Sequence, residues 1–111
     1  MSKDYREYLK HILDECDFVL VVTQSISFED FIRDETLKRA IVRSLEIIGE
    51  ATKKIPADIK TQWNTIEWKN IAGMRDRLIH DYMGVNYRIV WDVVLHKIPD
   101  IQRQIADFLR K

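Results

Sequence analysis

Glycine, proline and cysteine are scarce in this chain of 111 residues, which holds 3 Gly, 2 Pro and 1 Cys. All-β proteins need many turn residues, so this scarcity favours a helical fold. The single cysteine, Cys16, excludes a disulfide within the chain. Its helical spacing from Leu9, Ile12, Leu13 and Leu20 predicts a buried thiol.

Long hydrophobic runs are also absent. No stretch reaches the roughly 18 apolar residues that a membrane span requires, and the first ten residues, MSKDYREYLK, lack the apolar segment of a secretory signal. These absences, with so little cysteine, lead us to expect a cytoplasmic protein. The length predicts a single domain covering residues 1–111.

Net charge is zero, but the charges are separated along the chain. Residues 1–35 hold 4 Lys/Arg and 9 Asp/Glu, whereas residues 36–111 hold 14 and 9. A neutral protein with separated charges can present a basic face to phosphates, although the same charges could simply solvate helix surfaces.

Apolar spacing predicts an all-α fold, an antiparallel bundle of four to five helices. The expected helices cover residues 4–25, a short segment after Ser27, residues 34–55, residues 67–82 and residues 86–111. Ser27 is a predicted N-cap, with Asp30 three residues later. Gly49 within a helix predicts close approach of a neighbouring helix, and Pro99 is expected to kink or divide the last helix.

No phosphate-binding glycine loop, nucleophile elbow or metal-ligand spacing occurs in the sequence. His11 and His96 each lack a nearby cysteine or second histidine. The His80-Asp81 dipeptide alone is too short to indicate a metal phosphohydrolase. These observations leave one cluster, in the segment MRDRLIHDYMG at residues 74–84.

The cluster contains Arg75, Asp76, His80 and Tyr82. Arginine offers a planar set of donors suited to phosphate, and histidine can transfer protons near neutral pH. Tyrosine can stack on a base or carry a modification. Together they suit cleavage of RNA without a metal, in which the 2′-hydroxyl attacks the adjacent phosphorus. From these residues alone, a charged and capped helix end is the simpler interpretation.

Helical geometry limits how one chain could use this cluster. At about 100° per residue, Arg75 and His80 lie roughly 140° apart on a continuous helix, whereas Asp76 and His80 can touch and Asp76 could orient the imidazole. Either the helix loosens before Gly84, or two copies of the motif meet across a two-fold axis. We favour the second alternative, because symmetric dimers are the commonest oligomers.

The cluster resembles the R-X4-H-X-Y motif of HepT-like toxins in the HEPN superfamily, with Arg75, His80 and Tyr82 at the motif positions and Asp76 as the polar residue after the arginine. The resemblance extends through YLKHILDEC, RAIVRSLEIIGEATKKIP, IEWKNIAGMRDRLIHDYMGV and NYRIVWDVV, in the expected order. These segments cover most of the chain.

This resemblance implies a dimerising helical bundle that acts as the toxin of a toxin–antitoxin pair. It implies a metal-independent endoribonuclease, cleaving an RNA such as tRNA or mRNA in a cleft between two chains, with Arg75, His80 and Asp76 as catalytic residues and no cofactor. The implied partner is a nucleotidyltransferase antitoxin, bound in a homodimer or a larger assembly, that transfers AMP to Tyr82. An adenylate there would compete with RNA phosphate. Zero net charge favours a narrow RNA target, since few phosphates can be neutralised.

Two other hypotheses remain open from the sequence. The chain could be a non-enzymatic helical partner of the nucleotidyltransferase, or a nucleotide-binding module. RNA cleavage in EDTA tests the first alternative, and saturable ATP binding tests the second.

Overall fold

The structure, a computed structural model, describes residues 4–80 and 84–111, and for Ile79 and His80 it describes the backbone alone. In these residues the fold is all-α, as the sequence predicts, apart from one pair of two-residue strands. In chain order the elements are α1 (Tyr5–Val22), α2 (Phe28–Arg33), α3 (Glu35–Lys53), α4 (Ala57–Gln62), α5 (Trp68–Ala72), α6 (Met74–Leu78), β1 (Ile79–His80), β2 (Gly84–Val85), α7 (Tyr87–His96) and α8 (Ile98–Arg110).

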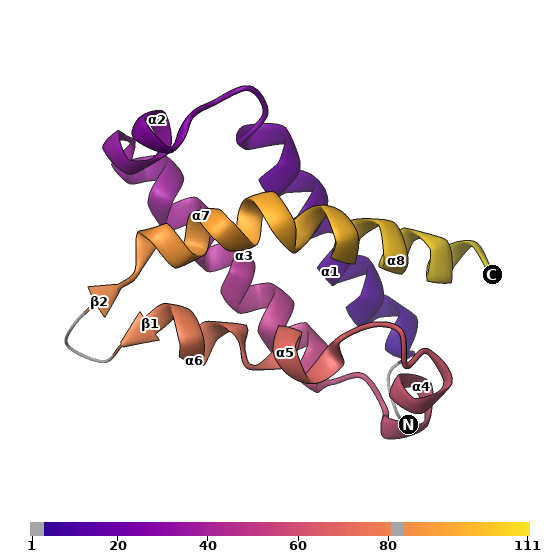
Figure 1. Cartoon of the computed structure of the whole chain (residues 1–111). Helices are drawn as coiled ribbons and strands as arrows, with labels where there is room; N and C mark the ends of the chain where they lie inside the picture. Colours follow the sequence, from indigo (N-terminus) through magenta and orange to yellow (C-terminus); the bar gives the residue numbers. More distant parts are fainter. Residues whose placement is uncertain (1–3, 81–83) are drawn as a thin grey trace.

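The longest helices, α1 and α3, lie side by side and run in opposite directions (Figure 1). α8 packs along α1, while α5 and α6 pack on α3. Two hydrogen bonds fix the antiparallel pairing of α1 with α8: Gln102 Nε2 donates to Asp17 Oδ1 at 3.2 Å, and Arg6 Nη2 donates to the Leu109 carbonyl at 2.8 Å. This arrangement buries one apolar stripe of each long helix.

The apolar spacing of α1 and α3 explains their burial. Fully buried side chains at helical intervals include Leu9, Ile12, Ile41 and Leu45. Cys16 is buried among them, as predicted. Burial raises the pKa of its thiol to about 12, which keeps it neutral and poorly nucleophilic.

Helix ends follow the local signals in the sequence. Ser27 Oγ accepts from the Asp30 N–H at 3.1 Å, and the Asp30 carboxylate accepts from the Ser27 N–H, so the predicted cap is a complete capping box. Pro99 lies at the start of α8, where its missing N–H costs little, and the last helical segment is divided in two as expected.

Gly49 is a point of close approach, as predicted. A Cβ added there would lie 3.4 Å from the Ala72 carbonyl oxygen and 3.5 Å from that of Ile71. The absence of a side chain therefore lets the end of α5 lie directly on α3.

An aromatic cluster joins α7 to α2. The rings of Phe31 and Trp91 stack with centroids 5.0 Å apart, and the Arg88 guanidinium lies 3.9 Å from the centroid of Phe28. This contact fixes the position of the start of α7. The chain that carries residues 74–84 must therefore end at that position.

The prediction of a helix over residues 67–82 is confirmed in part, but one continuous helix is wrong. Two helices of five residues lie in this range, separated at Gly73, and the second ends at Leu78. β1 then pairs antiparallel with β2, Ile79 opposite Val85 and His80 opposite Gly84, and the Asn86 N–H donates to the Leu78 carbonyl at 3.0 Å. These bonds take up backbone groups that a longer helix would have used.

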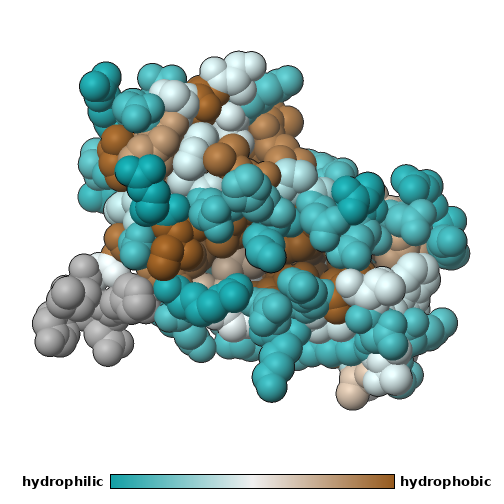
Figure 2. All heavy atoms as spheres, in the orientation of Figure 1, coloured by the Kyte–Doolittle hydropathy of each residue, from teal (hydrophilic) through white to brown (hydrophobic). Residues whose placement is uncertain are grey.

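Between α5–α6 and α7–α8 the surface is hollowed, and hydrophobic residues are visible at its base (Figure 2). Within the part of the chain that the structure describes, no helix has the length and apolar character needed to cross a membrane.

Candidate functional site

Arg75 projects from α6 and is half exposed. Its Nε donates to Glu46 Oε2 on α3 at 3.1 Å, and its Nη1 lies 3.9 Å from Asp76 Oδ1. Exposed pairs of this kind contribute about 0–1 kcal/mol, so an incoming phosphate can compete for the guanidinium. The guanidinium is thus held on the surface and remains accessible to an anion.

Asp76, next along α6, has a side chain that is 77% exposed. Its predicted contact with His80 assumed one continuous helix, in which residues four apart are neighbours. Because α6 ends at Leu78, that helical relation does not exist. The orienting role of Asp76 stays a prediction.

The histidine of the motif lies beyond the end of α6. The backbone of His80 lies in β1 opposite Gly84, and its side chain is not described. Tyr82 lies outside the described residues. Consequently, the 140° separation calculated for a continuous helix does not apply, because the helix ends before Gly84. The meeting of two motif copies across a two-fold axis stays a prediction.

The chain reverses direction at the motif and then re-enters a helix. Gly84 has φ +84°, a left-handed conformation that glycine adopts without strain. Asn86 Oδ1 accepts from the Ile89 N–H at 3.2 Å and so caps α7. The motif is therefore carried on a short helix and a hairpin at one end of the molecule (Figure 1).

The other histidines take no part in this arrangement. His11 is exposed on α1, with its ring edge-on to Tyr8, and His96 Nε2 lies 3.7 Å from Asp92 Oδ1 on α7. In residues 4–80 and 84–111, no group of three or more His, Cys, Asp or Glu side chains lies close enough to hold a metal ion.

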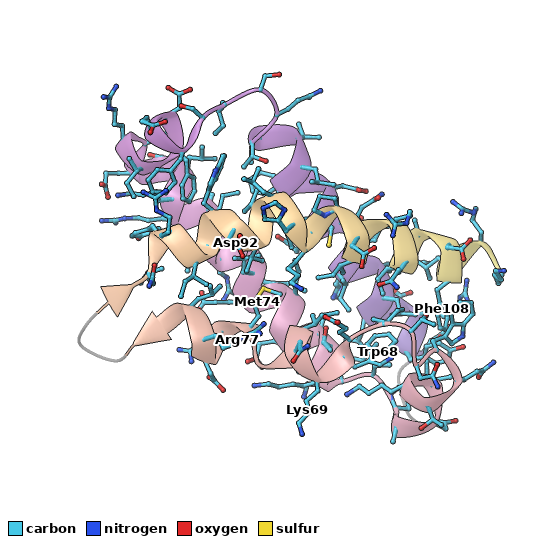
Figure 3. All side chains as sticks on the ribbon, viewed as in Figure 1. Trp68, Lys69, Met74, Arg77, Asp92 and Phe108 are labelled. Carbon is cyan, nitrogen blue, oxygen red and sulfur yellow. The ribbon has the colours of Figure 1, made fainter. Side chains whose placement is uncertain are left out.

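Two residues near the motif were missed from the sequence. Glu46 contacts Arg75 from α3, 29 residues away, and nothing in the helical pattern marks it as the partner of the arginine. Arg77 Nη2 donates to the Asn70 carbonyl at 2.9 Å. Met74 and Arg77 lie on the side of α6 that faces α7 (Figure 3). Arg75 and Arg77, both on α6, therefore lie on different surfaces of the molecule.

Comparison with known proteins gives consistent matches. The family model described as "Ribonuclease HepT-like" matches residues 7–108. The chain is 52% identical over 109 residues to a "Putative RNase" of Caldanaerobacter subterraneus subsp. tengcongensis, covering 98% of this chain and 97% of the relative. It is 38% identical to a "Putative RNase" of Methanocaldococcus jannaschii (98% and 90% covered). It is 41% identical to the "Probable ribonuclease HepT" of Thermococcus cleftensis (92% and 93% covered). No solved structure matches the chain.

Proposed function

The chain belongs to the HepT-like ribonuclease family, and on this premise we propose that it is a toxin that cleaves RNA without a metal ion. The observation that carries the proposal is the match over residues 7–108, which includes the whole segment from Arg75 to Tyr82. The half-exposed guanidinium of Arg75, which lies beside the carboxylates of Glu46 and Asp76, supports it.

In the proposed reaction, His80 takes the proton of the RNA 2′-hydroxyl as the 2′-oxygen attacks the adjacent phosphorus. The bond from phosphorus to the 5′-oxygen breaks, and that oxygen receives a proton. The products are a 2′,3′-cyclic phosphate and a 5′-hydroxyl. Arg75 neutralises the charge that develops on the nonbridging oxygens, and Asp76 orients the imidazole.

We also propose that two chains form a homodimer with their motifs lining a common cleft. A two-fold axis would concentrate two arginines and two histidines around one RNA strand. This placement supplies a local positive field in a protein whose net charge is zero, and it favours a folded RNA such as a tRNA over binding along any strand.

Inhibition by a nucleotidyltransferase antitoxin is the regulatory part of the proposal. Transfer of AMP to the Tyr82 hydroxyl would place a bulky anion beside the motif, where it excludes substrate phosphate. Incubation with the partner enzyme and ATP should add the mass of AMP to the wild type and none to Tyr82→Phe. Labelling of Tyr82→Phe would assign the modification to another residue.

Cleavage is tested with the full chain, RNA and EDTA. We expect the wild type to cleave, His80→Ala to be about 10²–10⁴-fold slower, and Arg75→Ala about 10²–10³-fold slower. Arg110→Ala is the matched control, because it removes another exposed arginine that is paired with a carboxylate, here Asp107 at the far end of α8. Cleavage by the His80 and Arg75 variants at the wild-type rate would overturn the assignment. No cleavage by the wild type would favour a non-enzymatic partner of the antitoxin.

A further inference from the structure

A cleft of about 150 Å³ lies between α5–α6 and α7–α8, on the side of α6 that carries Arg77 (Figures 2 and 3). Its apolar base is formed by Ile71, Met74, Val93 and Ile101, each less than one-tenth exposed. A site for a drug-sized ligand usually measures about 300–1,000 Å³. This cleft therefore suits a single planar ring system lying on an apolar floor.

The rim at the α6–α7 end carries two cationic side chains, Arg77 and Lys97. The ring of His96 also lines it. The bond from Arg77 Nη2 to the Asn70 carbonyl fixes the guanidinium and leaves its other N–H groups for a ligand. Within the described residues, neither Arg77 nor Lys97 forms an ion pair. This end of the cleft is suited to a phosphate.

The rim at the α5–α8 end presents hydrogen-bonding groups of both kinds. Gln104 Nε2 donates to the Thr65 carbonyl at 3.3 Å, and Asn70 Nδ2 donates to Glu67 Oε1 at 3.4 Å. Amide groups can pair with both donors and acceptors on a base edge, and a carboxylate accepts from an exocyclic amino group. The other carboxylate of the rim, Asp100, is paired with Arg103. This end of the cleft is suited to a base that carries an amino group.

The cleft shares a wall with the motif. Met74 and Arg77 line it, and Arg75 lies between them in sequence on the same five-residue helix. Arg75 bonds to Glu46 on α3 whereas Arg77 lines the cleft, so an RNA strand that contacts both arginines crosses α6 between them. The rim also offers the Arg77 guanidinium plane and the His96 ring, two groups on which bases stack in RNA complexes.

We propose that this cleft binds one nucleotide of the substrate RNA beside the cleaved bond. The base lies on the apolar floor with its amino group toward Glu67, and a phosphate contacts Arg77 and Lys97. This inference rests on the proposed ribonuclease function. It adds a preference for adenine, cytosine or guanine over uracil at one position of the substrate.

The test is a titration of the ¹⁵N-labelled full chain with AMP, CMP, UMP and inorganic phosphate, followed by NMR. We expect AMP and CMP to shift the side-chain amides of Asn70 and Gln104, and to bind more tightly than UMP or phosphate. Arg77→Gln should weaken AMP binding about tenfold or more, because it removes a charge-assisted hydrogen bond to the phosphate. Arg110→Gln, which removes the same charge at the far end of α8, should leave binding unchanged.

Several results would overturn the subsite. Phosphate that binds as tightly as AMP would show an anion site without base recognition, the property expected of a surface that docks an acidic protein. Absence of shifts at Asn70 and Gln104, or equal weakening by Arg110→Gln, would also end the proposal.

The cleavage assay separates this inference from the proposed function. In Arg77→Gln we expect the KM for RNA to rise about tenfold with kcat within about twofold of wild type, because the contact is to a neighbouring nucleotide. Cleavage without nucleotide binding in the cleft would leave the ribonuclease and remove the subsite. Binding in the cleft without cleavage would leave a nucleotide-binding site and remove the proposed ribonuclease function.

Discussion

The layer of α1, α3 and α8 and the motif segment from α5 to β2 differ in the length of their elements and in what they present to solvent. In the layer, long helices bury side chains such as Leu9, Ile41 and Ile105 completely. The motif segment also buries side chains such as Met74 and Leu78, but its short helix α6 carries two exposed arginines, which bond to one carboxylate and one backbone carbonyl. We infer that stability resides mainly in the layer and chemistry in the motif segment, so substitutions in the two regions should have separable effects.

The largest expected effect on stability comes from Leu45→Ala in α3. Leu45 is fully buried, and a truncation at such a site costs about 2–5 kcal/mol through lost burial and the cavity left behind. Arg75→Ala should change the free energy of unfolding by less than about 1 kcal/mol, because it removes only a surface pair. Urea denaturation of both variants measures the difference. Equal destabilisation would mean that the surface contacts of Arg75 stabilise the fold as much as the burial of Leu45 does.

The next effect concerns Gly49, where the two regions touch. Gly49→Val should destabilise by about 1–3 kcal/mol, because its γ-methyl groups would meet the carbonyls at the end of α5. Gly49→Ala should stay within about 1 kcal/mol of wild type, because its Cβ fits at ordinary contact distance and alanine favours the helix. Thermal unfolding compares the pair. A valine variant as stable as the alanine variant would show that α5 can move away from α3 at no cost.

The smallest effect is expected at the capping box of α2, away from the motif. Ser27→Ala removes the acceptor for the Asp30 N–H and should cost about 1 kcal/mol. RNA cleavage by this variant should match wild type below the unfolding transition. Ser27→Asp serves as the control, since aspartate also caps helices and should restore most of the stability. Loss of cleavage in a folded Ser27→Ala protein would contradict the separation of the two regions.

Much of the fold could be predicted because its signals are local. The apolar stripes of α1 and α3, the cap at Ser27 and the break at Pro99 each depend on residues within a few positions of one another. Gly49 shows the limit of this reasoning. Its presence predicts a close neighbour, but only the structure identifies that neighbour as the carbonyl groups of Ile71 and Ala72.

The error in residues 67–82 has a long-range cause. Their apolar spacing fits a helix, yet the bond from Asn86 to the Leu78 carbonyl and the pairing of β1 with β2 end α6 early. Both depend on where the aromatic cluster fixes α7. Helical periodicity does not show that these contacts compete with continuation of the helix. The geometric argument for a contact between Asp76 and His80 assumed a continuous helix, so it is also wrong.

The candidate site also combines features that the sequence predicts with features that depend on how the helices pack. The sequence identifies Arg75, His80 and Tyr82 through the motif, because residue types and spacing are sequence properties. The contact of Arg75 with Glu46 depends on how α6 packs against α3, and the cleft beside Arg77 depends on four helices meeting. The catalytic roles of Arg75, Asp76 and His80, and the modification of Tyr82, stay predictions that the experiments above address.

The bond from Arg6 to Leu109 brings the first turn of α1 and the last turn of α8 together at one corner of the molecule. The hairpin that follows α6 lies at the opposite side (Figure 1). A tag, fluorophore or second folded domain attached near Arg6 or Leu109 therefore extends away from the side on which we propose that RNA binds. Immobilising the protein through this corner should leave the motif open to solution, which makes surface-bound measurements of RNA capture feasible without redesigning the chain.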